Sequence, residues 1–481
     1  MHIIDILIFI VYMLFVLGIG IYFLRKNKNA DDYYVGGRSM GSSVIGLSVV
    51  ATDVGGGFSI GLGGLGFLMG LSGSWMLFTG LLGAWLSAVF LIPKAGKLSK
   101  RLKLYTFPQL FEFFYSPRVA LLAGIISAVG YIGFTSSQLL AGAKLASATF
   151  EGLDMTTALI FMGVIAVAYT AMGGLKAVIY TDVVQWIILL AGLILIGIPL
   201  GYHAIGGMEA IRATLPEEFL KLNNIGWPTI LNWAVTIIPI WFVGMTLYQR
   251  IYATRTPKEA QKAWYIAGAF EWPIMAFMGV ILGLFARVAF ENGMFAYMGF
   301  APGEMMDAEM GLPLLLRTIL PVGLMGLMMA AYFSAVMSTA DSCIMAASGN
   351  IESDILKKII PLPKSKRTRL IQSQLITLGI GLLGLLIALR MENVLELMLH
   401  SYAFMVSGLF VPVLGAFFTK RGSATGAFWS MITGGATTLT LTLLSVKLPY
   451  GLDPNIFGIT AAAICFLLLS KLFPGRRNVI D

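Results

Sequence analysis

A stripe of small and hydroxyl-bearing side chains lies within residues 312–347, a segment that is otherwise apolar. At about 100° per residue, one face of a helix here spans roughly 100° and carries Ala335, Ser338, Thr339 and Ser342. Asp341 lies about 60° further round the same helix. Hydroxyl and carboxylate oxygens are hard ligands that suit an alkali cation such as Na⁺. Bonding back to the preceding turn would explain a single serine but explains this cluster poorly, so the stripe predicts a sodium site.

Three consecutive glycines interrupt a second apolar segment, residues 43–70. They are Gly55, Gly56 and Gly57, and they follow Asp53 closely. Each glycine costs about 1 kcal/mol relative to alanine inside a helix, and a charge in mid-membrane is expensive. Close helix packing is the alternative role for such glycines. Beside an acid, the triplet favours a broken helix whose freed carbonyls face an ion or a substrate.

A third carboxylate, Asp182, follows a predicted cytoplasmic turn at Gly173, Gly174 and Lys176. It lies roughly 10 Å inside the next apolar segment. A buried carboxylate at that depth needs a cation or a strong donor. The depth allows Asp182 to meet Asp341 and its neighbours.

Other polar and aromatic side chains inside apolar segments are weaker candidates for contacts with a solute. They are Gln138, Thr246, Glu271 and Ser401, with Phe58, Trp75 and Trp241 as aromatic walls. Each is also explained by packing or by interhelical bonding. Pro239 and Gly244 favour an interruption within 229–250. If the chain contains inverted repeats, that segment is the structural mate of 43–70, and two matching broken helices point to a transport site.

The elements that position these residues are membrane-spanning helices. The 481-residue chain is 58% apolar and 12% charged, where a soluble protein carries about a quarter charged residues. The apolar residues form runs of about 20, the length that crosses roughly 30 Å of hydrocarbon as a helix. Thirteen spans are predicted, at 3–24, 43–70, 73–96, 119–146, 156–172, 177–200, 229–250, 263–289, 312–347, 370–389, 393–418, 424–446 and 455–472.

Loop charge predicts how these spans face. Most of the 33 Lys and Arg residues lie on one alternating set of loops, and Arg250 with Arg255, Lys258 and Lys262 forms one of these basic groups. The opposite loops are acidic. The positive-inside rule places the basic loops in the cytoplasm, the N-terminus outside and the C-terminus inside the cell (inner or plasma) membrane. The net charge of +9 therefore follows topology and does not indicate nucleic acid.

Catalysis is not predicted. Cys343 and Cys465 lie in apolar runs without a CxxC spacing, and the three histidines are scattered. No Ser/His, Cys/His or metal-ligand constellation supports an intramembrane enzyme. We expect one transmembrane domain over 1–481, with membrane lipid and a small solute as partners and no obligate protein partner.

Four motifs, in this order and spacing, resemble the sodium/solute symporter family, which includes sodium/proline, sodium/glucose, sialic acid and choline transporters. The motifs are Asp31–Arg38, Gly173–Gln185, Gln249–Arg250 with Glu259–Lys262, and Ser334–Ser342. The resemblance implies an all-α, leucine-transporter-like fold of two inverted five-helix repeats. These are expected at 43–200 and 229–418, with an extra N-terminal helix at 3–24 and two C-terminal helices at 424–472.

The resemblance also implies ligands for sodium. At the main site they would be the carbonyls of Ala51 and Val54, with Ala335, Ser338 and Thr339. Some relatives have a second sodium site, whose counterparts here are Asp182, Ser338, Asp341 and Ser342.

The solute is the most open expectation. Residues 54–58 look like the choline branch, whereas Asp53 matches the sodium/proline branch. A carboxylate can pair with an amine, and aromatic walls can hold a cation. We expect an amino acid, proline-like, or another amine-bearing solute, with Gly55 and Gly56 near it. Sugars, carboxylates and vitamins are alternatives, as are a proton-coupled carrier and a membrane-embedded solute sensor.

Overall fold

Long helices build the whole computed structural model, which describes residues 2–26, 35–53, 55–150, 152–360 and 366–475. These residues contain no β-strand. Eight of the described helices are long and apolar enough to cross a membrane, or nine if a bent pair is counted as one span. The all-helical membrane fold is therefore as predicted, while the number of 13 spans stays a prediction.

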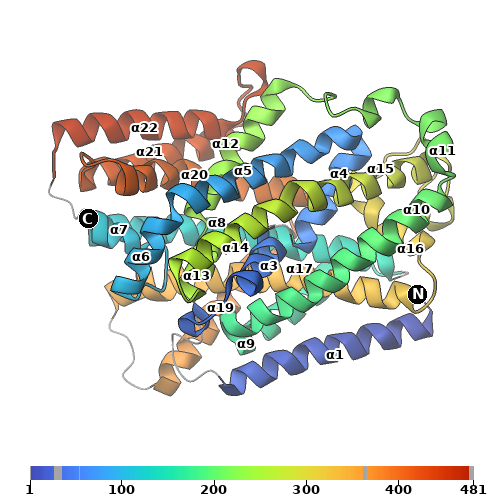
Figure 1. Ribbon diagram of the computed structural model, residues 1–481, viewed down its shortest axis with the longest axis horizontal. Helices are drawn as coiled ribbons and strands as arrows, with labels where there is room; N and C mark the ends of the chain where they lie inside the picture. The colour runs from blue at the N-terminus through green and yellow to red at the C-terminus, as the bar shows by residue number, and fades with distance from the viewer. Residues whose placement is uncertain (1, 27–34, 54, 151, 361–365, 476–481) are drawn as a thin grey trace.

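Most helices run roughly along the long axis of the molecule, and the two chain ends lie at opposite ends of that axis (Figure 1). The helices are α1 (Ile3–Lys26), α3 (Ser42–Asp53), α4 (Gly56–Met69), α5 (Trp75–Phe90), α6 (Ile92–Leu102), α7 (Gln109–Phe114), α8 (Pro117–Thr149), α9 (Met155–Gly192), α10 (Ile198–Ala204), α11 (Gly207–Thr214), α12 (Trp227–Val243), α13 (Met245–Ala253), α14 (Pro257–Phe270), α15 (Phe277–Glu291), α16 (Gly311–Ile319), α17 (Leu324–Gly349), α18 (Lys357–Ile359), α19 (Lys366–Ala388), α20 (Val394–Phe418), α21 (Ala424–Leu443) and α22 (Pro454–Leu472).

Two helices are broken where the glycines predicted it. The first break separates α3 from α4, with Gly55 at the N-terminal boundary of α4. The second separates α12 from α13 at Gly244, and the two pieces are bent by 41°. Each break frees backbone groups that an unbroken helix would satisfy internally. At the first break the Ala51 carbonyl accepts from Thr339 of α17, and at the second the Thr246 N–H donates to Tyr131 of α8.

The predicted span 312–347 is wrong as a single helix. Two helices, α16 and α17, replace it, and residues 320–323 separate them. Pro321 supplies no backbone N–H to a continuing helix, and Gly323 has a φ of 90°, which side-chain-bearing residues rarely adopt. The polar stripe belongs wholly to α17.

Helix α9 contains the predicted span 156–172 and the first part of the span 177–200, which continues through residues 193–197 into α10. Its path nevertheless folds back. Thr170 bonds Asp341 and Asp182 bonds Ser338, although 12 residues of straight helix would separate the two α9 residues by about 18 Å. Their partners on α17 are separated by only about 4.5 Å. The two halves of α9 therefore both line α17.

Helix α17 forms the centre of the bundle (Figure 1). Every residue from Met328 to Gly349 is buried, and α17 packs against α1, α3, α8 and α9. Helix α1 lies along one edge of the bundle, and α21 with α22 lies along another. The stripe on α17 therefore lies inside the protein.

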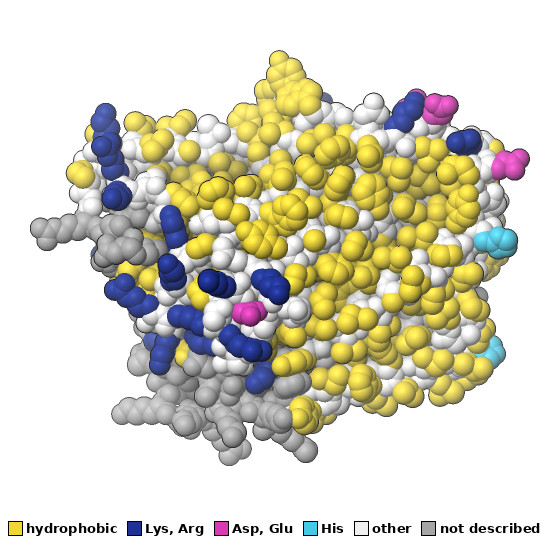
Figure 2. Space-filling model, in the orientation of Figure 1, with side chains coloured by type: hydrophobic (Ala, Val, Ile, Leu, Met, Phe, Trp, Pro, Cys, Tyr) yellow, Lys and Arg dark blue, Asp and Glu magenta, His cyan; other side chains and the backbone are white. Residues whose placement is uncertain are grey.

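Hydrophobic side chains cover a broad band of the surface (Figure 2). Most of the Lys and Arg side chains seen on this face lie towards the end of the molecule where the C-terminus is marked. A broad apolar band with basic residues gathered at one end is the pattern of a protein that crosses a membrane.

Candidate functional site

The end of α3 meets α17 beside the first break. The hydroxyl of Thr339 lies 3.3 Å from the carbonyl oxygen of Ala51 and 3.2 Å from that of Ala335. A Cβ at Gly55 would overlap the Thr339 hydroxyl and approach the Ala51 carbonyl oxygen to 2.8 Å. Only glycine therefore allows this approach of the two helices.

A small cavity of about 10 Å³ lies at this junction, lined by Ala51, Gly55, Ala335 and Ser338 among others. This volume is close to the roughly 10–15 Å³ that one water molecule needs. The structure thus brings together Ala51, Ala335, Ser338 and Thr339, four of the five residues predicted for the main sodium site. The fifth, Val54, lies outside the described residues.

Asp182 adjoins the same cavity and is ion-paired. Its Oδ2 lies 3.0 Å from Nη2 of Arg250, and the two side chains are 1% and 0% exposed. Its Oδ1 accepts the hydroxyl of Ser338. The interpretation of Arg250 as a cytoplasmic loop residue is therefore wrong, because Arg250 belongs to α13 and its side chain is buried inside the bundle.

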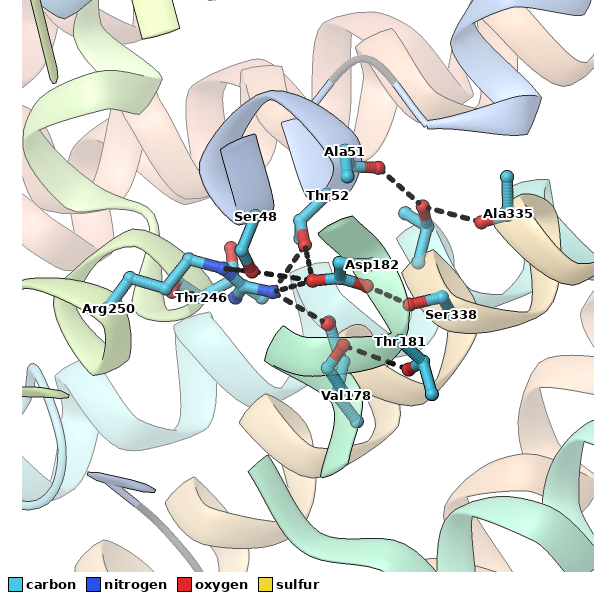
Figure 3. A network of polar contacts seen from close by, with 12 residues as sticks. Ser48, Ala51, Thr52, Val178, Thr181, Asp182, Thr246, Arg250, Ala335 and Ser338 are labelled. Atoms are coloured by element: carbon cyan, nitrogen blue, oxygen red, sulfur yellow. Dashed lines mark hydrogen bonds and ion pairs between the residues drawn. The ribbon is translucent and has the colours of Figure 1, made fainter. Parts of the chain in front are cut away.

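The Arg250 guanidinium joins four helix segments (Figure 3). It donates to Ser48 Oγ at 3.0 Å and to Thr52 on α3, to the Thr246 carbonyl at 3.2 Å within α13, and to Ser342 Oγ at 3.2 Å on α17. Ser48 also donates to Asp182 Oδ2 at 2.5 Å. A guanidinium has five N–H donors and keeps its charge inside proteins. Arg250 therefore provides the strong cationic donor that Asp182 requires.

Asp341 is not bonded to this pair and lies about 60° further round α17 than Ser338. Its Oδ1 accepts the hydroxyl of Thr170 on α9, and its Oδ2 has no hydrogen-bond partner among the described residues. Of the four residues predicted for a second sodium, Asp182 and Ser338 touch each other and Ser342 is reached through Arg250. Asp341 contributes a second buried carboxylate to the same region.

Several predicted solute contacts lie around α8. Tyr131 on α8 bonds Thr246 through its hydroxyl, at 3.1 Å from both the Thr246 hydroxyl and its backbone nitrogen. Gln138 lies two turns further along α8, and its Oε1 is buried without a partner among the described residues. Ser401 on α20 donates to the Leu397 carbonyl at 2.8 Å and faces Gly133 of α8. These residues share the wall that α8 presents to α13 and α20.

Three other predicted contacts lie along α5 instead. Trp75 opens α5 and donates to the Leu222 carbonyl at 2.7 Å. Trp241 packs edge-on against Trp264, and its ring lies where a Cβ of Gly83 would be. Glu271 is fully buried against Gly80. The helix ends at Asp53 and restarts at Gly56, while the side chains of Asp53 and Phe58 lie outside the described residues.

Tyr131, Ser48, Thr52, Thr170 and Arg250 complete the site, and sequence reasoning did not assign them to it. The i, i+4 spacing of Thr246 and Arg250 was the available signal, because it places both on one helix face. The basic residues that follow Arg250 in the sequence made it look like part of a cytoplasmic loop. The partners of Asp182 come from segments far apart in the chain, so no local pattern joins them.

The model of the sodium:solute symporter family matches residues 33–434. The chain belongs to this family.

Curated relatives of this sodium:solute symporter match along most of its length. It is 29% identical to the high-affinity proline transporter PutP of Bacillus subtilis over 88% of both chains. It is 28% identical to the sodium/proline symporter of Escherichia coli, with 96% of this chain and 92% of the relative covered. It is 27% identical to the human sodium/myo-inositol cotransporter 2, with 92% and 70% covered.

A solved structure shows the same fold. The chain superposes on a Na⁺-coupled sialic acid symporter with a TM-score of 0.80 at 23% identity, covering 99% of this chain and all of the other. A nucleobase-cation-symport-1 family transporter matches with a TM-score of 0.59 at 15% identity, covering 92% and 94%. The leucine-transporter-like fold is therefore confirmed. The protein is a multi-pass membrane symporter that couples a small organic solute to sodium.

Proposed function

We propose that the coupling sodium binds where α3 ends against α17, held by the Ala51 carbonyl, the Ala335 carbonyl and the hydroxyls of Ser338 and Thr339. The contact between Thr339 and Ala51 carries this proposal, because it joins the broken helix to the hydroxyl stripe. The Val54 carbonyl completes the set. All of these ligands are hard oxygens, as sodium requires.

The transport cycle follows from where these ligands lie. Sodium bridges α3 and α17, so its binding favours the arrangement in which the two helices touch. When sodium leaves, this bridge is lost, and α3 can move away from α17. Sodium and solute then raise each other's affinity by the same factor.

The proposed solute is an amino acid, proline-like, or another amine-bearing compound. Two of the relatives are named as proline transporters at 28–29% identity. The solute pocket lies between the two helix breaks and the wall of α8, with Gln138, Thr246 and Ser401 among its contacts. The buried Oε1 of Gln138 supports this position, because it lacks a partner among the described residues and can accept from an ammonium group.

The remaining proposed contacts are Asp53, Gly55, Gly56 and Phe58 at the first break. Trp75, Trp241 and Glu271 belong to the wall formed with α5. Asp182, Asp341 and Ser342 form the proposed second sodium site, where sodium would compete with the guanidinium of Arg250.

We also propose the cell membrane as the location, with the N-terminus outside and the C-terminus in the cytoplasm. The gathering of Lys and Arg towards the C-terminal end supports this orientation (Figure 2). The repeats are proposed at 43–200 and 229–418, each with one broken helix.

Uptake into proteoliposomes tests the proposal. Radiolabelled proline is offered under an inward sodium gradient, with glucose, pantothenate, choline and lactate as competitors. We expect sodium-dependent proline uptake that an excess of unlabelled proline abolishes. Full uptake without sodium under a proton gradient would overturn sodium coupling. Sodium-driven uptake of labelled glucose or pantothenate, with no uptake of proline, would overturn the assignment of the solute.

A further inference from the structure

A large apolar cavity lies next to the small sodium cavity, between α1, α8, α9 and α17. Its volume is about 820 Å³, within the roughly 300–1,000 Å³ of pockets that bury a whole small ligand. Aliphatic and aromatic side chains form most of its walls, including Phe9, Met13, Phe161, Met162 and Phe333. None of the described residues that line it carries a charge.

The cavity opens sideways into the membrane. Ile10 of α1 and Phe161 and Val164 of α9 line it and are 47%, 59% and 60% exposed. Exposed apolar side chains on membrane-spanning helices face hydrocarbon chains. Water does not fill an apolar space of this kind. Its occupant therefore enters from the hydrocarbon core of the bilayer.

Two polar side chains at the inner end of the cavity lack partners. Gln185 and Ser334 are 3% and 2% exposed and line the cavity. Neither Oε1 of Gln185 nor Oγ of Ser334 has a hydrogen-bond partner among the described residues. The Tyr12 hydroxyl faces Ser334 closely enough to interact with it, although neither oxygen has a partner within hydrogen-bond distance among the described residues. Polar groups in a membrane interior require partners, so the occupant brings its own donor and acceptor.

The depth of these groups restricts the occupant further. Ser334 lies 10 residues from the start of α17, which corresponds to about 15 Å along the helix. That is half of the roughly 30 Å hydrocarbon thickness. A phosphate or carboxylate head has no counter-charge here and would be expensive at this depth. A hydroxyl head, in contrast, donates to Gln185 and accepts from Ser334.

We propose that this cavity binds an uncharged single-chain lipid with a hydroxyl head, of the class of long-chain alcohols. The hydroxyl lies between Gln185 and Ser334, and the chain runs towards Phe161 and the bilayer. The site is separate from the solute pocket around α8, α13 and α20.

The bound lipid also acts on sodium, a consequence that rests on the proposed sodium site. Gln185 and Ser338 line both cavities, so the lipid head lies directly behind a sodium ligand. It stabilises α9 and α17 in the arrangement in which Thr339 reaches Ala51. Occupancy therefore raises the affinity for sodium about fivefold, at the lower end of usual coupling between sites.

Photolabelling of the full-length protein in nanodiscs tests the site. A dodecanol that carries an alkyl diazirine is bound in sodium-free buffer, and the labelled peptides are mapped. We expect labels on α1, α9 and α17, displaced by dodecanol at concentrations at least tenfold below those needed with dodecane or laurate. Equal displacement by all three competitors would overturn the hydroxyl head. Labels confined to other helices would overturn the site.

Variants make the test specific to the polar end. Gln185→Leu combined with Ser334→Ala should remove the preference for dodecanol over dodecane, and Ala158→Phe should block labelling by filling the cavity. Ser348→Ala, elsewhere on α17, is the control and should label as the wild type does. Because labelling needs neither sodium nor uptake, it succeeds or fails independently of the proposed transport function. A sodium titration by thermal shift, with and without dodecanol, then measures the fivefold effect, and unchanged sodium affinity would overturn the coupling.

Discussion

The carboxylate of Asp182 lies 3.0 Å from the guanidinium of Arg250, and both side chains are almost completely removed from the surface. The pair joins α9 to α13, and the hydroxyls of Ser48, Thr52 and Ser342 satisfy further donors of the same guanidinium. Removing one partner of a buried pair leaves the other charge buried without a counter-charge. Replacing either residue alone should therefore lower the stability of the fold by a large amount.

Arg250→Met should lower stability by about 3–5 kcal/mol, because it leaves the Asp182 carboxylate buried without its counter-charge. The thermal unfolding midpoint in detergent, measured without sodium, reports this loss. Adding Asp182→Asn should recover at least half of it. Arg255→Met is the control, since Arg255 is exposed and should change the midpoint little. A double variant that is no more stable than Arg250→Met would contradict the pairing.

The same variant should respond more strongly to sodium. Without the guanidinium, sodium is the remaining cation that can approach Asp182. Saturating sodium should therefore raise the unfolding midpoint of Arg250→Met by more than it raises that of the wild type. An equal or smaller rise would show that sodium does not reach Asp182.

Ser338→Ala combined with Thr339→Ala should raise the sodium concentration for half-maximal uptake at least tenfold, because two oxygen ligands are lost. Sodium-dependent thermal shift measures the binding part separately from transport. Ser348→Ala on the same helix, whose hydroxyl pairs with Thr377, should leave sodium dependence unchanged. Unchanged sodium dependence in the double variant would remove the stripe from the mechanism.

Gly55→Ala should abolish sodium-driven uptake. The added methyl group overlaps the Thr339 hydroxyl and crowds the Ala51 carbonyl, so α3 must separate from α17. Gly379→Ala is the matched control, because nothing lies within 4 Å of a Cβ there. Uptake and sodium affinity are measured on both variants, and only Gly55→Ala should lose them. Normal sodium affinity in Gly55→Ala would mean that this close approach is not required.

Lys144→Met should destabilise the protein by about 3 kcal/mol, the lower end for breaking a buried pair. Lys144 is 2% exposed and lies 2.6 Å from Glu309 Oε2. Glu309 also accepts the backbone N–H groups of Val394 and Leu395 at the start of α20, each at 2.9 Å. Lys221→Met is the control, because its pair with Glu217 is exposed and worth about 0–1 kcal/mol. An unfolding midpoint of Lys144→Met equal to that of Lys221→Met would contradict this prediction.

The sequence predicted those parts of the site that a single segment encodes. The glycine triplet predicted the break at Gly55, and hydroxyl spacing at helical period predicted the stripe that contains Ser338. The break and the stripe follow from local backbone and side-chain chemistry, so they can be predicted without knowing which other helices they contact. The need of Asp182 for a cation was predicted in the same way.

Tertiary contacts explain what the sequence did not predict. Arg250 is followed by basic residues that do lie at the surface, and only its contacts with α3, α9 and α17 distinguish it from them. Trp75 and Trp241 have the residue type of a binding wall, but they pack along α5. Residue type alone does not say which face of a bundle a tryptophan fills.

The fixed guanidinium beside Asp182 has an electrical consequence. A carboxylate alone, carried across a membrane potential of 100 mV, changes in energy by about 2.3 kcal/mol. The pair of Asp182 and Arg250 is neutral, and arginine does not lose its proton. Membrane voltage therefore exerts no net force on this pair when the empty carrier returns. The voltage dependence of transport then arises from the mobile sodium.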